Sequence, residues 1–206
     1  MDKAYLLGFL AADGFITDRN EIGIGVAEKD EEVVHFFQNQ LKSNKPSLQK
    51  GTEYPSVELR IQNKYLCDKA KEIGLAPRKS LILDISQIIK AAQLTDKQIS
   101  AFLLGYFDGD GCISLAHRKD NGKSYFEMNV TGTYETIQYF KTYFDNHGSI
   151  TKRHNDEKNN YTLQFSNNYL TIYNALKKLY EYKEELTFFF QRKYSLFAQL
   201  ELIVKS

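Results

Sequence analysis

Two aspartates stand at matching places in the sequence, each at the end of an apolar stretch and directly before a glycine. Residues 6–14 read LLGFLAADG and residues 103–111 read LLGYFDGDG, so the repeated carboxylates are Asp13 and Asp110. Each stretch predicts a helix whose final carboxylate meets the negative end of the helix dipole. Two such carboxylates held side by side repel each other and favour a divalent cation with oxygen ligands. The residues therefore predict a site for a divalent cation.

Small residues recur four positions apart within each of these stretches, at Gly8 and Ala12 and at Gly105 and Gly109. A glycine inside a helix costs about 1 kcal/mol relative to alanine, so its presence needs a physical reason. The reason we infer is close contact between two helix backbones, which brings the two aspartates together. The glycine that follows each aspartate predicts a left-handed helix C-cap.

The repeat extends beyond the two apolar stretches and recurs in the same order of elements. Alternating and helical hydrophobic patterns predict a hairpin, a helix, a second hairpin and a further helix in each half. In the first half these are residues 15–17 with 21–27, 30–42, 47–50 with 56–62, and 63–73. In the second half they are residues 112–116 with 124–131, 133–144, 148–153 with 160–166, a helix opened by residues 167–170, and a final helix at 185–202.

The pattern predicts an α+β fold made of two pseudo-symmetric αββαββα halves. Residues 1–94 form the N-terminal repeat with its linker, and residues 95–206 form the C-terminal repeat. The linker over residues 80–95 is apolar, so we expect it to pack and to hold both halves in one compact unit. Thr95 and Gln98 form a capping box that opens the second long helix.

Composition limits the classes of function that fit this chain. Its 206 residues carry a formal net charge of only +1, with 42% hydrophobic and 26% charged residues, which is typical of a globular protein. A surface that binds nucleic acid must therefore be local. Cys67 and Cys112 lack the spacing of metal ligands and favour a reducing compartment, and no apolar run approaches the ~20 residues of a membrane span. We expect a cytoplasmic protein with no membrane partner, encoded by a bacterium or phage or by an organelle.

The two repeated stretches resemble the LAGLIDADG motif of homing endonucleases, in the form that carries two motifs on one monomeric chain. The second copy matches closely, whereas the first has Ala11 in place of the motif's first aspartate. The resemblance implies a saddle of two antiparallel four-stranded sheets around a central helix pair. It also implies a site-specific double-strand DNA endonuclease, borne by an intron, that uses Mg²⁺ or another divalent cation.

The resemblance further implies which residues form the active sites. Asp13 and Asp110 are the metal ligands, each serving one DNA strand, and the backbone carbonyls of Ala12 and Gly109 complete the ligand set. A lysine from the segment after the last helix of each half, Lys79 or Lys193, stabilises charge or orients water. The family often has a polar residue, frequently Gln, at one further position in each half, and those positions are Glu28 and Gly132 in this chain.

Polar side chains on the outward-facing strand positions and hairpin tips would contact DNA, because a major groove admits a two-stranded β-ribbon. The expected DNA-binding residues are Arg19, Arg60, Gln62, Arg118, Lys119, Arg153 and Gln164. Alternation alone fits any half-exposed sheet equally well, so the motif carries this prediction. The expected partner is double-stranded DNA with a long specific site, with no obligate protein partner.

Two other functions remain open at this stage. A non-cleaving member of the same fold would act as an RNA-splicing maturase or a DNA-binding regulator, and Ala11 is a sign in that direction. A structural helix-sheet repeat protein without any nucleic-acid role is the second alternative. Retention of both Asp13 and Asp110 favours the nuclease.

Overall fold

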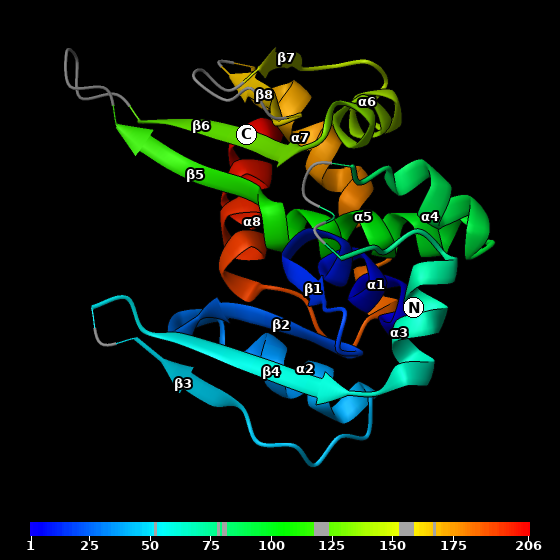
Figure 1. Ribbon diagram of the computed structural model, residues 1–206. Helices are drawn as coiled ribbons and strands as arrows, with labels where there is room; N and C mark the ends of the chain where they lie inside the picture. The colour runs from blue at the N-terminus through cyan, green and yellow to red at the C-terminus, as the bar shows by residue number, and fades with distance from the viewer. Residues whose placement is uncertain (52, 78, 80–81, 118–123, 153–158, 167) are drawn as a thin grey trace.

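In the computed structural model, two four-stranded antiparallel sheets lie on either side of a central pair of helices (Figure 1). The structure describes all residues except 52, 78, 80–81, 118–123, 153–158 and 167. The N-terminal half comprises α1 (Asp2–Asp13), β1 (Gly14–Ile16), β2 (Glu21–Ala27), the 3₁₀ turn η1 (Glu28–Asp30), α2 (Glu32–Gln40), β3 (Leu48–Lys50), β4 (Ser56–Gln62) and α3 (Lys64–Glu72). The fold class predicted from the repeat is confirmed.

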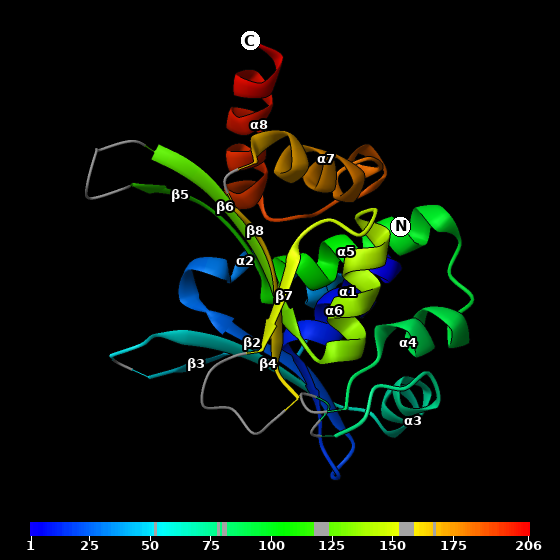
Figure 2. The same cartoon turned by 90° about the horizontal axis from the view of Figure 1, so that it is seen from above.

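The C-terminal half repeats this order after a connecting helix, α4 (Ile85–Ala91). It comprises α5 (Asp96–Asp110), β5 (Gly111–His117), β6 (Ser124–Gly132), α6 (Tyr134–Tyr143), β7 (Ser149–Lys152), β8 (Tyr161–Ser166), α7 (Tyr169–Leu179), the 3₁₀ turn η3 (Lys183–Glu185) and α8 (Gln191–Lys205). The strand orders β1-β2-β4-β3 and β5-β6-β8-β7 are equivalent, so the two halves are related by pseudo-symmetry. Figure 2 shows the strands of both sheets curving away from the helices.

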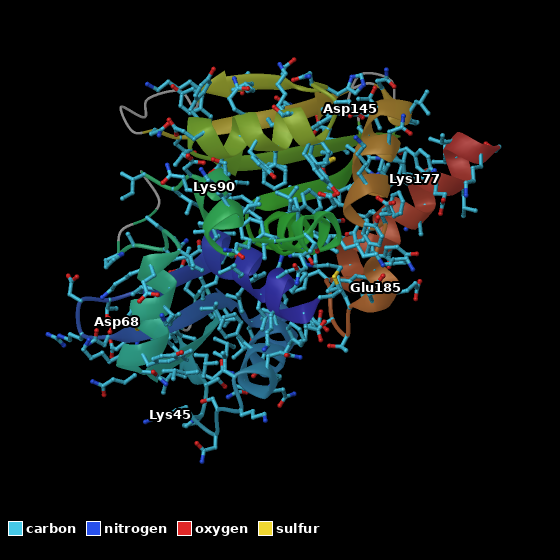
Figure 3. All side chains as sticks on the ribbon, turned by 90° about the vertical axis from the view of Figure 1, so that its right-hand side faces the viewer. Lys45, Asp68, Lys90, Asp145, Lys177 and Glu185 are labelled. Atoms are coloured by element: carbon cyan, nitrogen blue, oxygen red, sulfur yellow. The ribbon has the colours of Figure 1, made fainter. Side chains whose placement is uncertain are left out.

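Helices cover one face of each sheet, and the alternation of the strands explains why. In β4, Val57, Leu59 and Ile61 are buried against the helices, while Glu58 and Arg60 lie on the opposite face. The helical side of the molecule carries charges of both signs (Figure 3). No helix among the described residues is long and apolar enough to cross a membrane.

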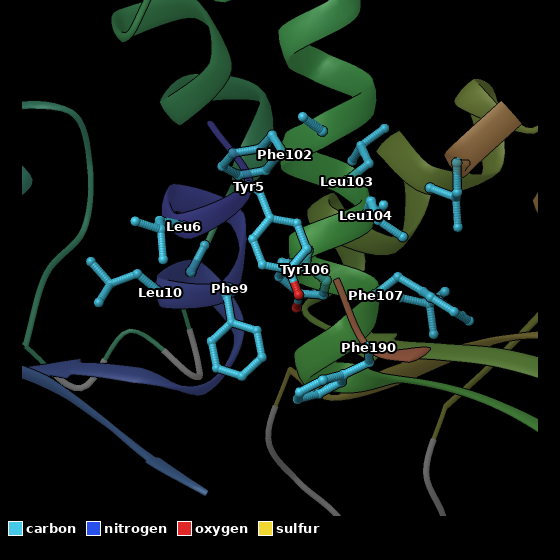
Figure 4. Packing of buried hydrophobic residues seen from close by; sticks show 14 of the residues in the cluster. Tyr5, Leu6, Phe9, Leu10, Phe102, Leu103, Leu104, Tyr106, Phe107 and Phe190 are labelled. Carbon is cyan, nitrogen blue, oxygen red and sulfur yellow. The ribbon is translucent and has the colours of Figure 1, made fainter. Parts of the chain in front are cut away.

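The central helices α1 and α5 pack with their backbones almost in contact. A Cβ atom added at Gly8 would lie 1.8 Å from the carbonyl oxygen of Phe102, and one added at Gly105 would lie 2.0 Å from that of Tyr5. Only glycine fits these two positions, which confirms the close approach predicted from the spacing. Aromatic side chains from both helices fill the space around the crossing (Figure 4).

The predicted left-handed C-caps are wrong, because Gly14 and Gly111 have φ values of −79° and −100°. These two positions require glycine because there is no room for a side chain. A Cβ at Gly14 would lie 2.5 Å from the Leu10 carbonyl oxygen, and one at Gly111 would lie 2.2 Å from the Phe107 ring. The chain can therefore leave each helix directly into a strand.

One predicted helix start agrees with the structure and another differs from it. Asn168, within the predicted opening at residues 167–170, is the N-cap of α7, and its side chain accepts a hydrogen bond from the amide of Thr171. The final helix begins at Gln191 rather than at residue 185, because residues 186–190 form an extended segment. Phe188 of this segment stacks on Phe36 of the N-terminal half, with ring centroids 4.8 Å apart. Phe188 and Phe190 therefore pack on the N-terminal half, whereas Phe189 contacts Tyr180 and Tyr194 of its own half.

The connecting segment packs as expected from its apolar residues. Ile85, Ile88 and Ile89 of α4 are buried. The carbonyl of Leu83 accepts hydrogen bonds from the hydroxyls of Thr133 and Thr136 at the start of α6. The linker of the first half is thereby fixed to the second half.

Candidate functional site

Asp13 and Asp110 end the two central helices, and the crossing brings these ends together. A Cβ at Gly109 would lie 2.5 Å from the Cβ of Ala12 and 3.4 Å from Oδ2 of Asp13. Burial and the nearby charge of Asp13 raise the pKa of Asp110 from 3.8 to about 6. Burial also raises the pKa of Asp13, although Lys79 and Lys193 oppose that shift. The prediction that the two carboxylates meet is consistent with this geometry.

Lys79 and Lys193 reach the ends of the same helices with their side chains buried. The Nζ of Lys79 donates to the carbonyl oxygens of Ala11 and Ala12 at 2.7 and 2.6 Å. The Nζ of Lys193 donates at 2.6, 2.9 and 2.6 Å to the carbonyl oxygens of Phe107, Asp108 and Gly111. Each lysine therefore caps the helix of its own half.

Burial lowers the pKa of each lysine from 10.5 to about 8, so both ammonium groups remain charged at neutral pH. The charges of Asp110 and Asp13 counter the shift at Lys79, and those of Asp108 and Asp13 counter it at Lys193. Two carboxylates and two ammonium groups thus lie together in one partly buried site. A site of this kind holds fixed positive charge close to the carboxylates without neutralising their repulsion completely.

The donor set fits a hard divalent cation. Asp13 and Asp110 offer carboxylate oxygens, which Mg²⁺ prefers together with water, and a cation there would relieve the repulsion that raises the pKa of Asp110. The two backbone carbonyls predicted as metal ligands differ in their hydrogen bonds. The carbonyl oxygen of Ala12 accepts a hydrogen bond from Lys79, whereas no bond to the carbonyl oxygen of Gly109 is described. The described residues contain no cluster of three or more His, Cys, Asp or Glu side chains that could hold a metal ion.

A cleft of about 520 Å³ opens beside Asp13, between the central helices and the N-terminal sheet. Its lining includes Asp13 and Gly109 from the two central helices and Arg192 from the start of α8. Both halves therefore contribute residues to the cleft.

Asp108 is a buried carboxylate at this cleft, and its role differs from that of Asp110. Its Oδ2 accepts hydrogen bonds from the Tyr5 hydroxyl at 2.7 Å and from the amide of Phe190 at 3.0 Å. Burial raises the pKa of Asp108 to about 6. Since these bonds join α1 to the segment that leads into Lys193, Asp108 positions that lysine. Ala11, at the equivalent place in the first motif, makes no such connection.

An ion pair also joins the two halves near the carboxylates. Arg192 donates from Nε and Nη2 to the two carboxylate oxygens of Asp30, at 2.8 and 3.1 Å. Arg192 follows α8's first residue and lies beside Lys193 in the sequence. Sequence reasoning missed this pair and the contacts of Asp108, because no local pattern identifies a partner so far away along the chain.

Four of the seven predicted DNA-binding residues lie among the residues that the structure describes. Arg60, Gln62 and Gln164 lie on the sheet faces opposite the buried side chains, and Arg19 is exposed in the turn between β1 and β2. Arg118, Lys119 and Arg153 lie outside the described residues. Glu28 is exposed in η1, and a Cβ at Gly132 would lie 2.6 Å from the Tyr106 hydroxyl. The assignment of these residues to DNA contact stays a prediction.

The pKa of Asp110 predicts a pH-dependent stability for the protein without metal. Between about pH 4 and pH 6 the folded protein keeps a proton that the unfolded chain has lost, because its folded pKa is about 6 against 3.8. The free energy of unfolding should therefore fall as the pH rises through this window. Asp110→Asn removes this contribution. Urea unfolding in EDTA should therefore show that the free energy of unfolding of the variant rises relative to that of the native protein from pH 4 to pH 6.

The exposed turn residue Asp18 provides the control, because Asp18→Asn should follow the native protein across the same window. At pH 7, Mg²⁺ should raise the unfolding free energy of the native protein but not that of a variant lacking both carboxylates. A native protein and an Asp110→Asn variant with parallel pH curves would contradict the assigned pKa.

Comparison with known proteins gives a family match for the C-terminal half and a fold for the whole chain. Residues 103–195 match the sequence model of a family described as LAGLIDADG endonuclease. A search of curated proteins finds no significant match. Among solved structures, meganuclease I-SmaMI bound to an uncleaveable DNA with a TTGT central four has a TM-score of 0.67 and 12% identity, covering 100% of this chain and 90% of that one.

Two further structures are similar over the same extent. The LAGLIDADG meganuclease I-AabMI bound to uncleaved DNA has a TM-score of 0.60 and 16% identity, covering 100% of this chain and 92% of that one. The LAGLIDADG homing endonuclease I-GzeII in complex with its DNA target has a TM-score of 0.63 and 13% identity, covering 100% and 90%. At these identities the structures establish the fold alone. The family match therefore covers the C-terminal half with its second motif, and over its whole length the chain has the fold of LAGLIDADG meganucleases.

Proposed function

We propose that this protein is a site-specific DNA endonuclease that cuts both strands of a long target, acting as a monomer with a divalent metal. The observation that carries the proposal is the proximity of Asp13 and Asp110 at one end of the helix crossing, with the buried Lys79 and Lys193 close to both and a cleft that Asp13 lines. The similar proteins I-SmaMI and I-GzeII were solved in complex with DNA, which supports a DNA substrate. I-SmaMI was also solved with uncleaved DNA in the presence of calcium ions, which supports a divalent cation.

Different residues of the chain would have different roles in hydrolysis. Asp13 and Asp110 would hold the metal, which when bound supplies an activated water and neutralises charge on the phosphate. The ammonium groups of Lys79 and Lys193 would add fixed positive charge where negative charge develops. The concave sheet faces would bind the duplex and present one phosphodiester of each strand to the carboxylates.

The test is a cleavage assay on DNA duplexes with the uninterrupted host sequence. This sequence is formed by joining the two flanks of this gene's insertion point. We expect a double-strand cut with Mg²⁺ and none with EDTA. A scrambled duplex of the same composition serves as the control for specificity. Specific binding without a cut in any divalent metal would instead favour a DNA-binding regulator, and specific RNA binding would favour a maturase.

A further inference from the structure

Three residues of the N-terminal sheet lie directly opposite one another across neighbouring strands. Phe15 of β1 pairs with Gly23 of β2, and Gly23 pairs with Arg60 of β4. A Cβ at Gly23 would lie 2.0 Å from the carbonyl oxygen of Leu59 and 2.8 Å from the Phe15 ring. Because the middle residue has no side chain, Arg60 reaches across it, and its guanidinium carbon lies 5.0 Å from the centre of the Phe15 ring.

Two carboxylates hold the same guanidinium in place. Glu58 Oε1 accepts from Nε of Arg60 at 3.0 Å and lies 2.9 Å from its Nη2. Glu21 Oε2 accepts from Nη1 at 3.1 Å, and Lys50 binds the other oxygen of Glu58 at 2.6 Å. The aromatic ring and two carboxylates therefore restrict the guanidinium, which is unusual for a side chain that is still 39% exposed.

These contacts leave donors available on the fixed arginine. A guanidinium has five N–H groups, and the contacts with Glu58 and Glu21 leave at least one N–H on each of Nη1 and Nη2. A pair of donors at the end of an arginine matches O6 and N7 of guanine in the major groove. The two carboxylates also offset the positive charge of Arg60. Arg60 therefore contributes little to the sequence-independent electrostatic attraction between the protein and DNA.

We infer that Arg60 is a specificity-determining residue that reads one guanine in the half-site contacted by the N-terminal sheet, a conclusion that rests on the proposed DNA-cleaving function. An arginine fixed in this way loses little conformational entropy on binding. Its donors stay unpaired opposite a base that lacks two acceptors at those places, which penalises the other bases. Arg60 thus contributes to sequence selection more than to general affinity.

The C-terminal sheet has a different set of residues at the equivalent positions. There Cys112 pairs with Asn129, and Asn129 pairs with Gln164, so the row is uncharged. The two half-sites should therefore be read by different chemistry, which fits a target without symmetry. Gln164 is exposed on its sheet face and provides a matched variant in the other half.

The experiment selects bound duplexes from a pool with a randomised central region, with Ca²⁺ in place of Mg²⁺ to keep the DNA intact. Native protein, Arg60→Ala, Arg60→Lys and Gln164→Ala are compared by sequencing the bound fraction. For Arg60→Ala we expect the preference for guanine at one position to fall roughly tenfold or more, with the other positions unchanged. Gln164→Ala should alter only positions in the opposite half-site.

Arg60→Lys separates base readout from a phosphate contact. Lysine keeps the charge but not the paired donors, so it should not restore the preference for guanine. A phosphate contact would instead lower affinity for all sequences and reduce the salt dependence of binding. Restoration by lysine, a uniform loss of affinity, or an unchanged base profile in Arg60→Ala would each overturn the inference. Failure of the native protein to enrich any duplex would overturn the proposed function as well.

Discussion

Asp110→Asn is expected to abolish cleavage while leaving DNA binding largely intact. The substitution keeps the size of the side chain at the end of α5 but removes one charged oxygen ligand from the carboxylate pair. Because metal-assisted hydrolysis draws several kcal/mol of stabilisation from the bound cation, the rate should fall roughly a thousandfold or more. Single-turnover cleavage of a saturating protein–DNA complex measures this rate directly.

Binding provides the control for this expectation. The concave sheet faces do not change in Asp110→Asn, so the dissociation constant for target DNA should stay within about threefold, which is less than 1 kcal/mol. Asp18→Asn, which removes an exposed carboxylate in the turn between β1 and β2, should cut at the native rate. Strong cutting by a variant that lacks both Asp13 and Asp110 would refute the assigned mechanism.

Much of the fold could be predicted because the chain repeats itself. The same order of elements recurs on both sides of the linker, so each weak strand signal is supported by its counterpart. The alternation in β4 identified its buried face correctly, since Val57, Leu59 and Ile61 all face the helices. The spacing of small residues in α1 and α5 predicted the crossing because nothing but close backbone contact explains glycine there.

The errors and omissions have a common physical origin in contacts between distant residues. Asp108 belongs to the second motif, but its partners Tyr5 and Phe190 come from opposite ends of the chain. The predicted start of α8 is wrong because Phe188 and Phe190 pack on the N-terminal half, which local propensity does not reveal. The lysines could be assigned by their order after each half's last helix, whereas their carbonyl partners could not be predicted.

Gly105→Ala should cause a large loss of stability. The added Cβ would lie 2.0 Å from the Tyr5 carbonyl oxygen and 3.0 Å from the amide nitrogen of Phe9, both backbone atoms that cannot move alone. The two central helices must separate, which disturbs the aromatic packing around them. We expect the free energy of unfolding to fall by about 3 kcal/mol or more, even though alanine favours a helix by about 1 kcal/mol over glycine. Urea denaturation in EDTA measures the change.

Gly25→Ala is the matched control, because the atoms nearest to its added Cβ belong to the Glu58 side chain at 3.9 Å. Its stability should stay within about 0.5 kcal/mol of the native value, as for other surface substitutions. The crossing also holds the carboxylates together, so Gly105→Ala should lose cleavage even at temperatures where it remains folded. Equal stability of the two variants would mean that α1 and α5 do not approach as closely as their glycines require, and the pairing of Asp13 with Asp110 would lose its structural basis.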